Sequence, residues 1–172
     1  FLSIILTKVL EFANKEEIDK LIIAECDRLE REYTMQDIAL PISINNIDGY
    51  TKNLPVHVRG ARIWNKYFAK NNLEKIINEK VKYVYVERWA KKELNYKKEY
   101  VISVPNKQEH WDMLENEIFI DYDKMKARLI TKPVEKFYNA MGWKMSNLAT
   151  TNSNGMFNAF KTSNKSSSVK ML

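Results

Sequence analysis

The sequence is poor in the residues that build disulfides, metal sites and tight turns. Its 172 residues include one cysteine, two histidines, four glycines and four prolines. The lone cysteine, Cys26, excludes an internal disulfide and suits a reducing compartment. One cysteine and two distant histidines cannot supply the four ligands of a structural zinc site, so we expect none.

Further absences narrow the class of protein. The glycines form neither of the patterns that cradle nucleotide phosphates, G-x-x-x-x-G-K and G-x-G-x-x-G. No run approaches the roughly 18 apolar residues of a membrane span, and the opening FLSIIL lacks the features of a signal peptide. His57 stands among basic residues and His110 in a turn-like segment, so neither suits a Ser-His-Asp site. We therefore expect no membrane partner and no catalytic residue in this chain.

Large apolar side chains are plentiful, and their spacing predicts the fold class. Hydrophobic residues make up 45% of the chain, with four Trp, nine Tyr and seven Phe to fill a core. Apolar residues recur at helical spacing over much of the chain, whereas VKYVYVERW and YVISV have strand character. These patterns predict an α+β fold, mainly helical with a small antiparallel β-hairpin. The expected helices cover 3–13, 15–32, 56–72, 111–119 and 122–141, and the expected strands cover 38–44, 81–89 and 100–104.

Individual residues refine this prediction. Alternation along the first hairpin strand places Tyr83, Tyr85 and Trp89 on one face. Asn14 can cap the helix that follows it, because its side-chain oxygen can accept from free backbone N–H groups. Pro133 should kink or interrupt the last helix, because proline removes a helical hydrogen bond.

The composition near the C-terminus changes to Ser, Thr, Asn and Lys. We therefore expect a folded domain over residues 1–148 and a flexible tail over residues 149–172. The tail contains one apolar island, MFNAF, which places Met156, Phe157 and Phe160 on a short helical turn. Such a turn is typical of a docking peptide, and the alternative is that it packs on its own domain.

The net charge of +6 is unevenly distributed. Residues 1–40 carry five basic and nine acidic side chains. Residues 49–73 carry five basic and no acidic ones, residues 80–98 carry seven and two, and residues 124–144 carry six and one. These blocks predict a one-sided positive surface, for which nucleic acid is the usual partner. The alternative is a solvated basic exterior with no partner.

The stretch IDYDKMK contains a D-x-D pair, a spacing that phosphoryl-transfer enzymes use to hold divalent metal. Two-metal chemistry needs several converging carboxylates, and Asp121 and Asp123 are only two. The alternative is that Asp121 caps the next helix and Asp123 lies in its first turn, where negative charge is favoured. We favour the helix cap and keep a metal-dependent nuclease as a third hypothesis.

Two segments suit binding of nucleic acid. The stretch VHVRGARIWN places His57, Arg59 and Arg62 near a helix start. Gly60 within it would allow the backbone to approach a phosphate. The stretch LITKP places Lys132 at the expected kink, where its side chain can reach a groove. The alternatives are a basic surface helix and an ordinary solvated lysine.

Four features follow one another along the chain: DRLEREY at 27–33, LPVHVRGA at 54–61, the hairpin strands, and IDYDKMKARLITKPVE at 120–135. Together they resemble the C-terminal thumb region of family B DNA polymerases from T-even-type bacteriophages. The resemblance covers roughly residues 5–160, and HVRG and TKP are its most specific parts. A difference is the stretch TSNKSSSVKML after the apolar island, where the relatives end.

The resemblance implies a grip on primer–template DNA. The family's thumb holds the backbone and minor-groove side of the new duplex through lysines, arginines and backbone amides. His57 and Arg59 match its H-x-R-G segment, where they either contact phosphate or hold the thumb together, and Lys132 matches a position that faces DNA. The expected DNA-binding residues are Lys52, His57, Arg59, Arg62, Arg128 and Lys132. The family's C-terminal aromatic peptide binds the sliding clamp, and its counterparts here are Met156, Phe157 and Phe160.

In that family, the catalytic aspartates and their Mg²⁺ lie in a palm domain, whose motifs do not occur here. The resemblance therefore implies a non-catalytic part of a DNA-directed DNA polymerase, a nucleotidyltransferase of DNA replication, in the cytoplasm of an infected bacterium. Its partners would be primer–template duplex, the palm, fingers and exonuclease parts, and a sliding clamp; no cofactor would bind this chain. Because the first residue is Phe1, we expect either a piece of a whole polymerase or one subunit of a split one. The alternative function is a stand-alone basic adaptor that binds nucleic acid.

Overall fold

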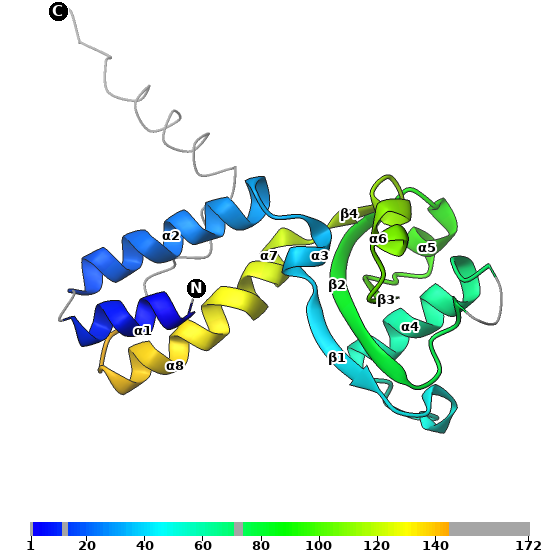
Figure 1. Ribbon diagram of the computed structural model, residues 1–172, viewed down its shortest axis with the longest axis horizontal. Coiled ribbons are helices and arrows are strands. Elements are labelled where there is room, and N and C mark those ends of the chain that lie inside the picture. Colours follow the sequence, from blue (N-terminus) through cyan, green and yellow to red (C-terminus); the bar gives the residue numbers. More distant parts are fainter. Residues whose placement is uncertain (1, 12–13, 71–73, 145–172) are drawn as a thin grey trace, which may run out of the picture. The chain divides into compact units, whose positions relative to one another are not determined.

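The computed structural model divides into two units over the residues that it describes (Figure 1). We call residues 27–129 the sheet unit, and residues 1–26 with the chain from 130 onward the helical unit. The predicted tail, 149–172, lies outside the described residues. The structure describes residues 2–11, 14–70 and 74–144.

The sheet unit is built on a long strand, β2 (Glu79–Trp89). Strand β3 (Val101–Pro105) pairs with it antiparallel along one edge. Along the other edge, β1 (Leu40–Ile44) pairs with the first half of β2 and β4 (Ile118–Ile120) with its second half, both antiparallel (Figure 1). The predicted hairpin of β2 and β3 and the predicted strand at β1 are therefore confirmed, as is the α+β class.

The prediction of a single helix over residues 111–119 is wrong. Helix α6 (Gln108–Leu114) ends early, and β4 follows it. Ile118 and Ile120 are buried, whereas Phe119 between them is 46% exposed. This period of two fits an edge strand that covers the core with one face, and it cannot be satisfied by a helix.

Helix α4 (Val56–Tyr67) packs against β3, and it ends earlier than predicted (Figure 1). Gly60 is buried at this contact, where an added Cβ would lie 2.6 Å from the Ser103 nitrogen and 2.8 Å from the Ile102 carbonyl carbon. The Ser103 hydroxyl donates to the His57 carbonyl at 2.7 Å. Gly60 therefore allows α4 to approach its own sheet. The prediction that this glycine opens the backbone to a phosphate is wrong.

Short helices complete the sheet unit. In α3 (Met35–Ile38), Thr34 and Asp37 form a capping box: each side chain accepts from the other residue's backbone N–H, at 3.2 and 3.0 Å. Helix α5 (Lys92–Tyr96) lies in the connection between β2 and β3, and its buried Leu94 anchors it to the core. Large, fully buried side chains of this core include Trp64, Trp89, Leu94, Ile102 and Leu114.

The last predicted helix is interrupted just before Pro133. Helix α7 (Tyr122–Lys126) passes into a π-helical turn over Ala127–Thr131, and α8 (Lys132–Ala140) follows. Pro133 lies in the first turn of α8, where its missing N–H removes no hydrogen bond within that helix. The predicted interruption is confirmed and takes the form of a wider turn.

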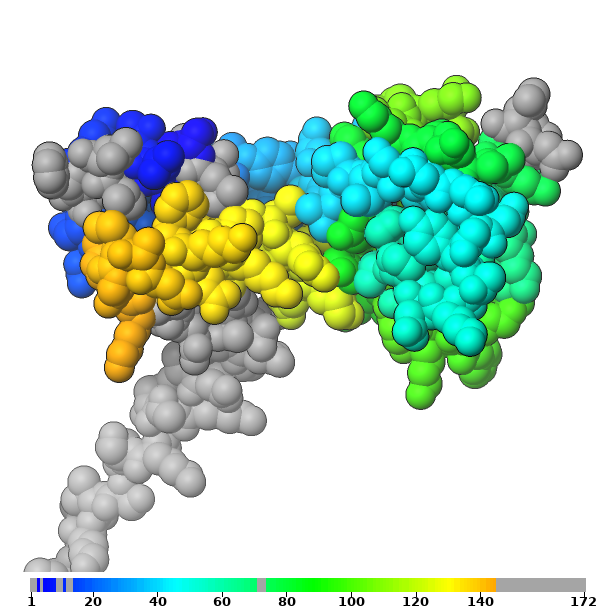
Figure 2. Space-filling model, turned by 90° about the horizontal axis from the view of Figure 1, so that it is seen from below, coloured from blue at the N-terminus to red at the C-terminus, as the bar shows by residue number. Residues whose placement is uncertain are grey.

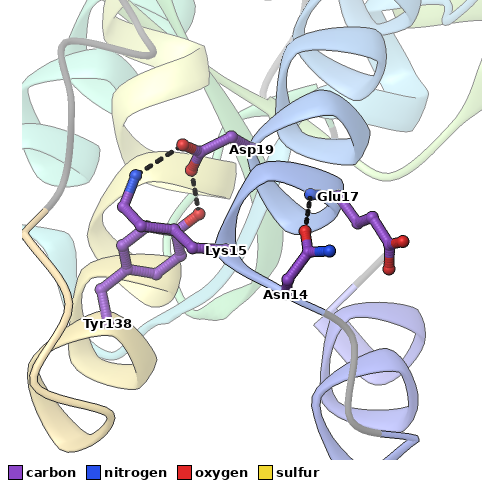
Figure 3. Close-up of polar contacts among 5 residues, drawn as sticks. All are labelled: Asn14, Lys15, Glu17, Asp19 and Tyr138. Carbon is purple, nitrogen blue, oxygen red and sulfur yellow. Dashed lines mark hydrogen bonds and ion pairs between the residues drawn. The ribbon is translucent and has the colours of Figure 1, made fainter.

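The helical unit contains α1 (Leu2–Leu10), the first part of α2 (Lys15–Arg31), and α8. The Asn14 side chain accepts from the backbone N–H of Glu17 at 2.9 Å, so the predicted cap of α2 is confirmed (Figure 3). In the described part of the chain, no helix is long and apolar enough to span a membrane. Buried apolar side chains of this unit include Ile5, Ile18, Ile22 and Val134.

A polar contact joins α8 to α2 inside the helical unit (Figure 3). The Tyr138 hydroxyl donates to the Asp19 carboxylate, and Lys15 Nζ pairs with the same carboxylate at 2.6 Å. Tyr138 is only 1% exposed, so its hydroxyl needs this acceptor. Trp143 packs edge-to-face on the Tyr138 ring at 5.6 Å.

Candidate nucleic-acid interface

One face of the sheet unit gathers aromatic and basic side chains from separate segments. Tyr83 and Tyr85, two residues apart on β2, point to the same face of the sheet. Tyr83 lies opposite Ser103 on β3, over which α4 packs. His57 comes from the first turn of α4, and Tyr100 immediately precedes β3. Helix α7 and the π-helical turn add a lysine and an arginine. We call this surface the tyrosine face, which comprises His57, Tyr83, Tyr85, Tyr100, Lys124 and Arg128.

Ring contacts hold the tyrosine face together. The Tyr83 ring centroid lies 6.3 Å from that of His57 and 5.9 Å from that of Tyr85, the second pair being edge-to-face. Lys124 Nζ lies 6.0 Å from the Tyr85 centroid and 5.7 Å from the Tyr100 centroid. Tyr85 is 9% exposed and Tyr100 is 43% exposed. The face therefore has a buried base, which fixes its position, and an open rim.

Burial and charge set the protonation of this face. Burial lowers the pKa of the His57 imidazole, so at pH 7 the ring is neutral and offers one N–H donor. Burial also raises the pKa of the Tyr83 hydroxyl, and the positive charge of Arg128 opposes that shift. Arg128 is exposed, and no carboxylate within the described ranges forms an ion pair with it. Arg128 is therefore an uncompensated charge on the tyrosine face.

The D-x-D pair begins a helix. The Asp121 carboxylate accepts from the Lys124 backbone N–H at 2.9 Å and pairs with Lys124 Nζ at 2.5 Å. Asp123 is exposed in the first turn of α7. The predicted helix cap is confirmed. Among the residues that the structure describes, no cluster of three or more His, Cys, Asp or Glu side chains could hold a metal ion.

The other predicted DNA-binding residues are exposed. Lys52 lies in the loop between β1 and α4, and the cyan segments that include this loop cover part of the sheet unit in the view of Figure 2. Arg59 and Arg62 lie on α4, and one Arg62 nitrogen donates to the Tyr50 carbonyl at 2.6 Å. Lys132 starts α8 and belongs to the helical unit. The predicted clamp-docking residues lie outside the described residues: Met156, Phe157 and Phe160.

The sequence predicted both His57 and Arg128 as DNA-binding residues, but it did not predict most of their neighbours on the tyrosine face. The shared side of Tyr83 and Tyr85 was visible in the alternation of β2. The places of Tyr100 and Lys124 depend on the pairing of β3 with β2 and on the packing of α7 against β2, so no local pattern reports them. Also missed were three residues that line a pocket with Arg59 and Arg62: Lys66, Tyr67 and Lys97.

Comparison with known proteins identified no relative of this chain among protein families or curated sequences. The function of the chain is therefore inferred from its residues and their arrangement.

Proposed function

We propose that this chain is the thumb part of a family B DNA polymerase, which grips primer–template duplex while a palm domain outside the chain performs catalysis. The resemblance of the HVRG and TKP segments supports this proposal. The observation that carries the proposal is the tyrosine face, whose side chains come from segments that are far apart in the sequence. Of the expected DNA-binding residues, His57 lies beside the Tyr83 ring, and the positive charge of Arg128 acts on the Tyr83 hydroxyl.

The chemistry of the tyrosine face suits a DNA backbone. The Arg128 guanidinium can donate two parallel hydrogen bonds to a phosphate. The neutral His57 ring and the Tyr83 hydroxyl can donate to phosphate or sugar oxygens. Flat rings between these donors can cover the apolar side of a deoxyribose. Because backbone contacts carry no sequence information, we expect binding with little sequence preference.

Affinity in this proposal comes mainly from phosphate contacts, so it should fall steeply as salt is raised. Lys132 contributes through its match to a DNA-facing family position, and the exposed Lys52, Arg59 and Arg62 add positive charge. Lys132→Ala should weaken duplex binding by a similar factor for every DNA sequence. An unchanged duplex affinity in this variant, alone or with a palm-bearing chain, would remove Lys132 from the grip.

The chain adds processivity and no chemistry in this proposal. Palm, fingers and exonuclease parts belong to the same polypeptide or to an associated subunit, and the palm holds Mg²⁺. A sliding clamp meets the apolar island of the tail. The setting is DNA replication in the cytoplasm of an infected bacterium.

Fluorescence anisotropy of the full chain with a labelled primer–template duplex tests the proposal. Arg128→Ala removes the free charge of the tyrosine face, and we expect it to weaken duplex binding roughly tenfold. Arg31→Ala is the matched control, because Arg31 is exposed on α2 and forms no ion pair within the described part of the chain. Equal affinities of the two variants would count against the tyrosine face as the grip.

Co-purification separates a polymerase thumb from a stand-alone adaptor. The proposal requires a palm-bearing chain, joined covalently or bound, and longer products per binding event when this chain is present. Duplex binding without any such chain would favour the adaptor.

A further inference from the structure

A pocket beside α4 combines an apolar floor with a basic rim. Its volume is about 200 Å³. Leu54, Ile63 and the ring of Tyr67 supply the apolar surface, and Glu99 adds one carboxylate. Four basic side chains complete the lining: Arg59, Arg62, Lys66 and Lys97. The charges of these lining residues sum to a positive value, so an anionic ligand is favoured.

Two of the four basic groups are fixed in place. Arg62 donates to the Tyr50 carbonyl at 2.6 Å, which ties it to the loop before α4. Lys97 Nζ pairs with Glu93 at 2.7 Å and donates to the Tyr67 hydroxyl at 2.7 Å. The Tyr67 hydroxyl in turn donates to Glu93 at 3.0 Å. These bonds order one wall of the pocket before a ligand arrives, which lowers the entropy lost on binding.

The other two basic groups are available to a ligand. The Arg59 and Lys66 side chains are exposed and make no hydrogen bond or ion pair within the described residues. Lys66 Nζ lies 5.1 Å from the Tyr67 ring centroid, a position it can leave without breaking an ion pair. Arginine and lysine are the usual donors to phosphate, so the rim can take a phosphate group.

The size and floor of the pocket point to the remainder of the ligand. Pockets that enclose drug-sized ligands have volumes of roughly 300–1,000 Å³, so this pocket has room for one ring system. A phosphate alone would gain nothing from the Leu54, Ile63 and Tyr67 surfaces. A nucleobase would use them, because aromatic side chains bind bases of any identity by stacking.

We propose that this pocket binds one unpaired nucleotide, with its base against Tyr67 and its phosphate on Arg59 and Lys66. The base takes the place of Lys66 over the Tyr67 ring, and the lysine moves to the phosphate. The inference rests on the proposed function in that its partner is also nucleic acid. It uses none of the six side chains of the tyrosine face, and Tyr67 is not among the expected duplex-binding residues, so a Tyr67 variant tests the pocket separately from the grip.

Anisotropy of the full chain with a labelled single-stranded oligothymidylate tests this site. Tyr67→Leu should weaken binding by roughly 5- to 100-fold, the range of one lost base–aromatic contact. Tyr67→Phe keeps the ring and should stay close to wild type. Arg59→Ala with Lys66→Ala should reduce both the affinity and its salt dependence. The matched control for charge is Arg31→Ala with Lys75→Ala, two exposed residues outside the pocket lining.

Competition experiments identify the source and class of the ligand. Displacement of the oligonucleotide by thymidine monophosphate indicates a site for a free nucleotide, whereas displacement by unlabelled strand alone indicates a strand. Equal competition by inorganic phosphate or by a phosphopeptide would overturn the nucleotide assignment. Wild-type single-strand affinity in Tyr67→Leu and in the double alanine variant would also overturn it. Duplex affinity in Tyr67→Leu, set against that in Arg128→Ala, shows whether a failure lies here or in the proposed function.

Discussion

Replacing Gly60 by alanine should destabilise the sheet unit. The new methyl group would lie 2.6 Å from the Ser103 amide nitrogen and 2.7 Å from its hydroxyl oxygen, whereas ordinary contacts begin at 3.4 Å. The Ile102 carbonyl carbon, at 2.8 Å, blocks the same space. Since two of these atoms are backbone atoms, relief requires α4 to move away from β3. That movement stretches the hydrogen bond from Ser103 to the His57 carbonyl.

The expected loss in the free energy of unfolding is about 2 kcal/mol. Overpacking costs about 1–3 kcal/mol and the weakened hydrogen bond about 1 kcal/mol. The better helix propensity of alanine returns about 1 kcal/mol. For a chain of this size, the net loss lowers the melting temperature by about 4–8 °C.

Thermal and urea unfolding, followed by tryptophan fluorescence, measure this loss. Gly49→Ala is the matched control, because the nearest atom to its added Cβ belongs to the flexible Asn46 side chain, at 3.2 Å. We expect the control to change the free energy of unfolding by no more than about 0.5 kcal/mol. Wild-type stability in Gly60→Ala would refute the close approach of α4 to β3.

Further predictions concern caps and protonation. Asp121→Ala should lower the free energy of unfolding, measured in urea, by about 1 kcal/mol because the α7 cap is lost. If wild type cleaves DNA in Mg²⁺ and this variant does not, the nuclease hypothesis is restored. Hydrogen bonds from Thr34 lower the pKa of the Asp37 carboxyl, so these bonds stabilise the fold above the usual pKa of Asp and cease to do so as the pH falls. Thr34→Val should therefore reduce the loss of stability on acidification. An unchanged dependence of stability on acidic pH would contradict this prediction. Burial and the bond to Asp19 raise the pKa of the Tyr138 hydroxyl, so wild-type stability should fall as pH rises above about 10. Tyr138→Phe should show a smaller fall in urea titrations; some fall remains because burial also raises the pKa of the Tyr83 and Tyr122 hydroxyls. The variant should also lose about 2 kcal/mol at neutral pH, and a pH profile parallel to that of wild type would contradict the assignment.

Features that depend on neighbouring residues were predictable from the sequence. Asn14 and Asp121 cap the helices that follow them, because each side chain satisfies a backbone N–H three residues on. The alternation along β2 and the apolar, β-branched run of β3 indicate strands, and β3 is buried on both faces. Strand β4 was missed, since it is three residues long and only residues 115–117 separate it from α6.

Features that depend on distant residues were not predictable. Gly60 stands beside an arginine in the sequence, but its role is set by Ser103, which reaches it through the sheet. Arg62 is shared between the pocket rim and the Tyr50 carbonyl, and no local pattern reports that bond. The tyrosine face likewise requires α4, β2 and α7 to converge. The sequence therefore predicted His57 and Arg128 as DNA-binding residues, but it could not show that they belong to the same face.

The salt dependence of duplex binding shows whether the tyrosine face grips DNA through phosphate contacts. The measurement compares the slope of log K against log salt concentration for wild type, Arg128→Ala and Arg31→Ala. If Arg128 contacts a phosphate, its removal should reduce the magnitude of the slope by about 0.9, and Arg31→Ala should leave it unchanged. Identical slopes and affinities in all three proteins would contradict the assignment of the tyrosine face as the DNA grip.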